Sequence, residues 1–245
     1  MNHTVFFELC VESLEAGRAA EAGGANRIEL CSELECGGIT PSAELQTGNL
    51  QSLAIPVHVL IRPRSGDFCY SPEEFIEMRR QIEQAKLAGA GGIAVGILHA
   101  DRRVDVERTR VLVELARPLD VTFHRAFDET PDLYDSLERV IETGADSLLT
   151  SGGAADVLSG AELIGNLRRQ AGDRIQVIAG GGLRLESLVE VVRRAGVYSL
   201  HGSLTRKNRK HASSANGNTL ESDVREAIRL LRSEHRATLA STMES

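Results

Sequence analysis

Short apolar runs alternate with longer amphipathic segments along most of the chain. Each run has the length of one buried strand, and the segments between the runs carry apolar residues at helical spacing. The predicted strands cover residues 5–10, 26–31, 57–62, 91–97, 120–124, 145–150, 174–179 and 197–201. The predicted helices cover residues 12–23, 41–53, 72–89, 105–117, 132–143, 156–171, 185–195 and 220–235.

Three helix starts carry a recognisable signal, a hydroxyl residue followed by proline. Thr40-Pro41, Ser71-Pro72 and Thr130-Pro131 each predict an N-cap residue with proline at the first helical position. Glu74 follows Ser71 at the spacing of a capping box.

Eight such βα units predict an α/β protein, a single-domain TIM (β/α)8 barrel, because parallel strands joined by helical crossovers bury both faces of their sheet. A doubly wound open sheet is the alternative, and the absence of a G-x-G-x-x-G motif after the first strand weakens it. We expect one domain over residues 1–236, a long last βα loop at 203–219 and a frayed tail at 237–245.

One face of the predicted strands is unusually polar. The tripeptide Glu-Leu-Cys occurs at residues 8–10 and again at 29–31, and alternation directs each carboxylate and its thiol to the same side. Barrel interiors are normally apolar, and buried ionisable groups are costly unless they are paired or hydrated. We therefore predict a polar ligand cavity; the alternative is a buried ion pair of Glu29 with Arg27 or Arg62. The inward face also carries Arg27, His58, Arg62, Thr122, His124, Ser199 and His201.

Glycines follow the seventh and eighth predicted strands, at the end of the barrel where TIM-barrel active sites lie. Backbone N–H groups exposed by glycines at these two positions commonly hold phosphate. The alternative is that the glycines serve only the turns. The predicted anion-binding or substrate-binding set is Arg27, His58, Arg62, Gly180, Gly181, Gly182, His201 and Gly202.

The acid–base candidates are Glu8, Glu29, His58, His124 and Asp128, and the enzyme hypothesis uses Glu8, Glu29 and His124. A lone histidine on a strand is more often structural than catalytic, but Arg125 and Asp128 follow His124 at a strand end and strengthen its catalytic interpretation. None of the three lysines (Lys86, Lys207 and Lys210) ends a strand, and this excludes Schiff-base chemistry. The chain also lacks a Walker-type loop, so we expect no nucleotide cofactor.

Cys10 and Cys31 are predicted on adjacent parallel strands, ~5 Å apart in the hydrogen-bonding direction and both facing inward. Two thiolates suit soft Cu(I), whereas zinc requires four donors. The alternative is that both cysteines are small buried hydrophobic residues. Cys36 and Cys69 fall in predicted loops and are interpreted as bystanders.

Composition narrows the classes of partner. The net charge is −7 and lysine is scarce, so a nucleic-acid partner is not expected, and the basic stretch 206–211 is interpreted as a solvated loop. The chain shows neither a signal peptide nor a run of ~20 apolar residues, so no membrane association is expected. Four cysteines in 245 residues do not indicate a disulfide framework. These features predict a cytoplasmic protein with reduced thiols.

Six segments form a specific combination of motifs along most of the chain. They are Arg-Ile-Glu-Leu-Cys at 27–31, Gly-Gly-Ile-Thr-Pro-Ser at 37–42, Ile-Arg-Pro-Arg-Ser-Gly-Asp-Phe-Cys-Tyr-Ser at 61–71, Val-Thr-Phe-His-Arg-Ala-Phe-Asp at 121–128, Leu-Thr-Ser-Gly-Gly at 149–153 and Ala-Gly-Gly-Gly at 179–182. Together these segments resemble the CutC copper-homeostasis family. The resemblance implies a cytoplasmic TIM barrel, a homo-oligomer, that is associated with copper tolerance and proposed to bind Cu(I). Cys10 and Cys31 match the proposed copper ligands of that family.

Two functional hypotheses remain open from the sequence. The first is a copper-homeostasis protein that holds Cu(I) between Cys10 and Cys31. The second is an enzyme that acts on a small anionic or phosphorylated metabolite through Glu29 and His124, with Glu8 assisting. An inert structural barrel is a third, weaker interpretation, because it leaves the inward charges unexplained.

Overall fold

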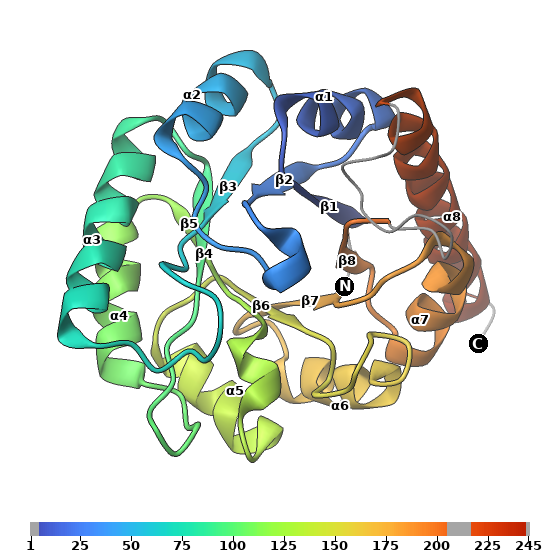
Figure 1. Ribbon diagram of the computed structural model, residues 1–245. Helices are drawn as coiled ribbons and strands as arrows, with labels where there is room; N and C mark the ends of the chain where they lie inside the picture. The colour runs from blue at the N-terminus through green and yellow to red at the C-terminus, as the bar shows by residue number, and fades with distance from the viewer. Residues whose placement is uncertain (1–4, 205–216, 244–245) are drawn as a thin grey trace.

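The computed structural model describes residues 5–204 and 217–243, and it is a closed barrel of parallel strands inside a ring of helices (Figure 1). The predicted TIM-barrel fold is confirmed. The strands are β1 (Phe6–Val11), β2 (Arg27–Leu30), β3 (Val57–Leu60), β4 (Gly92–Val95), β5 (Asp120–Phe123), β6 (Ser147–Thr150), β7 (Gln176–Gly180) and β8 (Ser199–Gly202). The helices are α1 (Leu14–Gly23), α2 (Ala43–Ser52), α3 (Pro72–Leu87), α4 (Val106–Ala116), α5 (Leu133–Glu142), α6 (Ala161–Ala171), α7 (Leu188–Ala195) and α8 (Gly217–Met243). Short 3-10 turns are η1 (Leu34–Cys36), η2 (Arg125–Glu129) and η3 (Leu185–Ser187).

Strand order in the barrel follows chain order, and β8 pairs with β1 to close it. The register places Glu8 beside His201 and Cys10 beside Glu29. The apolar face of each strand points to the helices, where residues such as Val59 and Ile93 are fully buried. The two-residue alternation therefore sends the polar set to the barrel axis, as predicted.

Helix α3 begins as its sequence predicts. The Ser71 hydroxyl accepts a hydrogen bond from the Glu74 N–H, and the Glu74 carboxylate accepts one from the Ser71 N–H. The other two proline signals mark the wrong residue, because α2 is capped by Ser42 and α5 by Asp132. At both places a better-placed oxygen lies beyond the proline and accepts from the first-turn N–H groups.

Two further helix boundaries differ from expectation. Helix α6 starts at Ala161 instead of residue 156, because the preceding segment forms turns in which Gly152 and Gly153 adopt positive φ angles of 72° and 68°. Helix α8 continues to Met243, so the tail expected to fray from residue 237 is helical there. The basic stretch 206–211 and most of the predicted 203–219 loop lie outside the described residues.

Helix α8 lies beside α1 and closes the ring of helices (Figure 1). The joint is close, because a Cβ on Gly23 of α1 would lie 2.6 Å from the Val224 Cβ. No helix within the described ranges is long and apolar enough to cross a membrane.

On the barrel axis, the β2–α2 loop with η1 reaches over the mouth in Figure 1 and contributes Leu34 and Cys36 to its lining.

Candidate functional site

A cavity of about 590 Å³ opens at the C-terminal ends of the strands. This volume lies in the usual range of small-molecule sites, ~300–1,000 Å³. The residues predicted from the sequence that line it are Cys10, Glu29, Cys31, Arg62, His124, Gly181, Gly182, His201 and Gly202. Glu8, Arg27, His58 and Gly180 are buried beneath this lining, in strands β1, β2, β3 and β7.

The two predicted thiols meet in one wall of the cavity. Cys10 and Cys31 are both buried and unoxidised, and their Sγ atoms lie 3.2 Å apart. The hydrogen bond with Cys31 raises the pKa of the Cys10 thiol well above its ordinary value, and burial and the nearby Glu29 carboxylate add to the effect. Cys10 is therefore a protonated thiol at neutral pH unless a cation replaces the proton.

His201 of β8 lies between two carboxylates. Its Nδ1 is 2.6 Å from Glu8 Oε1, and its Nε2 is 3.8 Å from Glu29 Oε2. Burial alone would lower the pKa of His201, but the charges of Glu29 and Glu8 raise it above its ordinary value. Because the short contact fixes Nδ1 on Glu8, the Nε2 atom faces the cavity side of the pair.

The two glutamates have opposite environments. Burial alone would raise the pKa of Glu8, but the Arg27 guanidinium and His201 outweigh it and hold that pKa well below its ordinary value. Burial raises the pKa of Glu29, and His201 offsets this only in part. The predicted alternative of a Glu29 pair with Arg27 or Arg62 is wrong, since Arg27 Nε donates to Glu8, and its Nη2 donates to Thr122.

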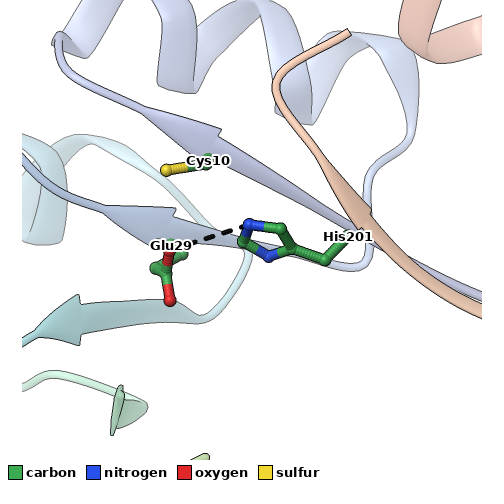
Figure 2. A group of neighbouring side chains, drawn as sticks. All are labelled: Cys10, Glu29 and His201. Carbon is green, nitrogen blue, oxygen red and sulfur yellow. Dashed lines mark ion pairs between the residues drawn. The ribbon is translucent and has the colours of Figure 1, made fainter. Parts of the chain in front are cut away.

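Figure 2 shows how Cys10, Glu29 and His201 converge from strands β1, β2 and β8. One donor atom from each side chain lies within 4.8 Å of the other two, close enough to hold one cation. Thiolate sulfur and imidazole nitrogen are donors that Cu(I) accepts, and a carboxylate that orients the imidazole is a common supporting group. The donor chemistry of this wall therefore fits a soft metal ion.

His58 is packed inside the barrel, with its Nδ1 buried and without a hydrogen-bond partner among the described residues, whereas Arg62 makes hydrogen bonds to two loops. Burial and the Arg27 charge lower the pKa of His58 to about 4, so its ring is neutral, and it packs where a Cβ on Gly92 would lie 2.3 Å from it. Arg62 donates from Nη1 to the Gly38 carbonyl oxygen at 2.9 Å and from Nη2 to that of Gly66 at 2.7 Å. Arg62 thus ties together the two loops that follow β2 and β3.

His124 directly follows β5, caps the N-terminus of η2 and lines the cavity. Its Nδ1 accepts a hydrogen bond from the Ala126 N–H at 3.1 Å, which places the ring proton on Nε2. Burial, with the charges of Arg62 and Arg125, lowers the pKa of His124 to about 3. The ring is therefore a neutral donor at neutral pH.

A network that the sequence did not predict lies directly after His124. Asp128 accepts hydrogen bonds from the Ser151 N–H at 3.0 Å, the Ser151 hydroxyl at 2.9 Å and the Gly153 N–H at 3.0 Å. It also forms an ion pair with Arg125 Nε at 2.9 Å. The adjacency of Arg125 and Asp128 to His124 was the available signal, but their partners come from the loop after β6, which no local pattern reveals.

The consecutive glycines 180–182 at the end of β7 differ in role. Gly180 is a strand residue, where a Cβ would lie 2.7 Å from Leu149 and 3.0 Å from His201. Gly181 and Gly182 adopt positive φ angles of 110° and 64° at the cavity lining. Among residues 5–204 and 217–243, their N–H groups have no hydrogen-bond partner.

The fold and the strand-end cavity place the chain among TIM barrels with an open cavity at the C-terminal ends of their strands. The model of the CutC family matches residues 5–206. This chain belongs to the CutC family.

Relatives from several sources agree with the family match. A CutC family protein of Caulobacter vibrioides (strain NA1000 / CB15N) is 43% identical over 201 residues, which are 82% of each chain. One from Vibrio vulnificus (strain YJ016) is 42% identical over 206 residues, again 82% of each chain. A solved CutC structure from Streptococcus agalactiae, whose name connects it with copper homeostasis, has a TM-score of 0.78 at 30% identity and covers 82% of this chain and 100% of its own.

Proposed function

We propose that this protein acts in copper homeostasis by binding Cu(I) as cargo between Cys10 and Cys31, in the reducing cytoplasm. The observation that carries the proposal is the 3.2 Å separation of two unoxidised thiol sulfurs in the wall of an open cavity. The name of the Streptococcus agalactiae relative supports the same role. The homo-oligomeric state that the family resemblance implies stays a prediction.

His201 is the third donor that the arrangement favours. Its Nε2 faces Cys10 and Glu29, and Glu8 holds the opposite ring nitrogen at 2.6 Å. A carboxylate on the far nitrogen of a ligating histidine fixes its orientation and makes it a better donor. Because the thiols must lose protons when the metal binds, Cu(I) affinity increases as pH rises.

The test is an anaerobic Cu(I) titration against a competing chelator. Wild-type protein is expected to bind one Cu(I) per chain, and the double variant Cys10→Ser, Cys31→Ser is expected to lose this site because hydroxyl oxygen is a poor ligand for a soft cation. Cys69→Ser is the matched control, since Cys69 is a half-buried thiol outside the cavity lining.

Unchanged Cu(I) affinity in the double variant would contradict the proposal, whatever the behaviour of Cys69→Ser. Cys36 is an exposed thiol that also lines the cavity, so Cys36→Ser measures its separate contribution. A loss of binding in Cys36→Ser alone, with Cys10 and Cys31 intact, would move the site to the η1 loop.

The enzyme hypothesis receives less support in the form that the sequence suggested. A proton-transferring His124 needs a nitrogen lone pair at the ligand, but its Nδ1 accepts the Ala126 N–H and its Nε2 carries the proton. Because the pKa of His124 is lowered to about 3, the ring is not protonated to imidazolium at neutral pH and cannot act as a general acid in that form. The geometry favours a hydrogen-bonding role for His124 instead.

A further inference from the structure

The wall of the cavity opposite the thiols carries the guanidinium of Arg125, which hydrogen bonds hold in one orientation. Arg125 follows β5, which faces β1 across the eight-stranded barrel. Its Nε donates to Asp128 at 2.9 Å and its Nη2 donates to the Ser151 hydroxyl at 3.2 Å. Within the described part of the chain, its Nη1 makes no hydrogen bond, and the side chain is 43% exposed.

Gly181 provides the space that this guanidinium occupies. A Cβ on Gly181 would lie 2.9 Å from the Arg125 Cζ and 3.0 Å from the Ser151 Cβ. The guanidinium therefore packs on the backbone that leads into Gly182. This brings a fixed positive charge beside the backbone N–H groups of Gly181 and Gly182, which are without partners in the described ranges.

Asp128 does not compete for the ligand, although it carries the opposite charge. Its oxygens already accept hydrogen bonds from the Ser151 N–H, the Ser151 hydroxyl and the Gly153 N–H in addition to Arg125. Because the carboxylate is buried and saturated with donors, it positions Arg125 and leaves Nη1 available. A preorganised arginine of this kind is typical of sites for carboxylate or phosphate.

His124 supplies a second, different donor next to Arg125. Its Nε2–H is buried and has no hydrogen-bond partner among the described residues, while the ring lines the cavity. The Phe68 ring packs against the His124 ring, with their centroids 5.1 Å apart. The Arg62 guanidinium lies over the Phe68 ring, 4.7 Å from its centroid. A buried donor without a partner is costly, so a ligand oxygen at Nε2 would relieve that cost.

We propose that this wall is a binding subsite for a small organic oxyanion, in which Arg125 and the Gly181 and Gly182 backbone bind the charged group and His124 donates to a second oxygen of the ligand. The ligand is a carboxylate or a phosphate ester that fits a cavity of about 590 Å³. The subsite goes beyond Cu(I) binding and does not depend on it, since it shares no residue with the thiol wall.

The first test compares Arg125→Gln with Arg117→Gln by isothermal titration calorimetry, using inorganic phosphate and malonate as probes. Arg117 is a matched control because its side chain is also 43% exposed and ion-paired, with Asp146, but it precedes β5 at the opposite end of the barrel. Wild type and Arg117→Gln are expected to bind at least one probe, and Arg125→Gln to bind it about tenfold more weakly or worse.

The probe that binds identifies the source of the oxyanion. Binding of phosphate alone assigns a phosphorylated ligand, and binding of malonate alone assigns a carboxylate. The proposal is overturned if wild type binds neither probe at millimolar concentration, or if Arg125→Gln binds as tightly as wild type.

The second test isolates the His124 donor. In His124→Asn the side-chain oxygen can still accept the Ala126 N–H, because asparagine is a good N-cap residue, but the donor at the Nε2 position is lost. With 2-phosphoglycolate, which carries an oxyanion at each end, we expect binding weakened about tenfold, and with inorganic phosphate unchanged within about twofold. Equal binding of 2-phosphoglycolate by both proteins would remove His124 from the subsite.

Cu(I) titration of the same variants separates this proposal from the copper proposal. Arg125→Gln and His124→Asn are expected to bind Cu(I) as wild type does, because neither residue contacts Cys10 or Cys31. Loss of Cu(I) binding in the cysteine double variant with intact phosphate or malonate binding would support both proposals independently.

Discussion

Glu8 and Glu29 are neighbouring buried carboxylates whose charges have opposite consequences for stability. Glu8 accepts from Arg27 and contacts His201, and its pKa is held low. Glu29 is desolvated without an arginine at hydrogen-bonding distance, and its pKa is raised. Ionised Glu8 therefore stabilises the fold at neutral pH, whereas ionisation of Glu29 destabilises it.

Glu8→Gln is expected to lower the free energy of unfolding at pH 7 by about 3 kcal/mol, because it leaves the Arg27 charge buried without its partner. Glu29→Gln, the matched variant on the next strand, is expected to leave the free energy of unfolding unchanged or to raise it. Urea denaturation followed by circular dichroism measures both. A larger loss in Glu29→Gln than in Glu8→Gln would contradict this assignment of charges.

The pH dependence of the same pair gives a second check. Since the folded-state pKa of Glu8 is depressed, its contribution is fully present above the unfolded value, near 4.5, and is lost as pH falls from there toward the folded pKa. The difference in stability between wild type and Glu8→Gln should therefore be constant near neutral pH and shrink below about pH 4.5.

At the scale of elements, Arg62 links the loops that frame the mouth. It donates to carbonyl oxygens of Cys36 and Gly38 in the β2–α2 loop and of Gly66 in the β3–α3 loop. The β2–α2 loop is also held by the bridge between Ser32 and Ile39, by the Leu34 N–H that donates to Glu12 at 2.8 Å, and by the Thr40 N–H that donates to the Arg62 carbonyl oxygen. The Arg62 guanidinium is thus one of the contacts that position η1 relative to β3.

Arg62→Lys is expected to loosen both loops while leaving the barrel folded, because an ammonium cannot reproduce the planar fork that reaches three carbonyls. Hydrogen–deuterium exchange should become roughly tenfold faster at residues 32–40 and 64–70, for a loss of about 1.4 kcal/mol in local stability, with β5 to β7 unchanged. Arg80→Lys is the control, since Arg80 forms an exposed pair with Glu77 on α3. Unchanged exchange in the two loops would mean that Arg62 does not hold them.

At the scale of the whole molecule, the ring of helices closes where α1 meets α8. Gly23 is required there because a Cβ would lie 2.6 Å from Val224 and 2.9 Å from the Glu221 carbonyl oxygen. Gly48, in α2, has no atom within 4 Å of the same virtual Cβ. The two helical glycines therefore differ in the space around them and not in chemistry.

Gly23→Ala is expected to destabilise the protein by about 1–3 kcal/mol through overpacking of the α1–α8 joint. Gly48→Ala is expected to stabilise it by about 0.4–1 kcal/mol, because alanine reduces the entropy of the unfolded chain. Chemical denaturation curves of both variants measure the sign directly. A Gly23→Ala variant as stable as wild type would show that α8 can shift away from α1 without a loss of stability.

The barrel could be predicted from the sequence because its signals are local. Alternation within short strands placed Cys10 and Glu29 on the inner face, and repetition of βα units fixed the order of strands. The partners of each charge could not be predicted, because Glu8 meets Arg27 through the register of β1 with β2 and meets His201 only through the closure of the barrel by β8. Asp128 was harder still, since its donors belong to an irregular turn between β6 and α6.

The contact between Glu8 and His201 joins residues 193 positions apart in the chain. During synthesis, the two thiols of β1 and β2 leave the ribosome early, whereas the imidazole belongs to the last strand made. A chain that ends before β8 therefore has both sulfur atoms but lacks His201, and Glu8 lacks one of its partners. Under the Cu(I) proposal, the complete donor set forms only when β8 has paired with β1 and closed the barrel.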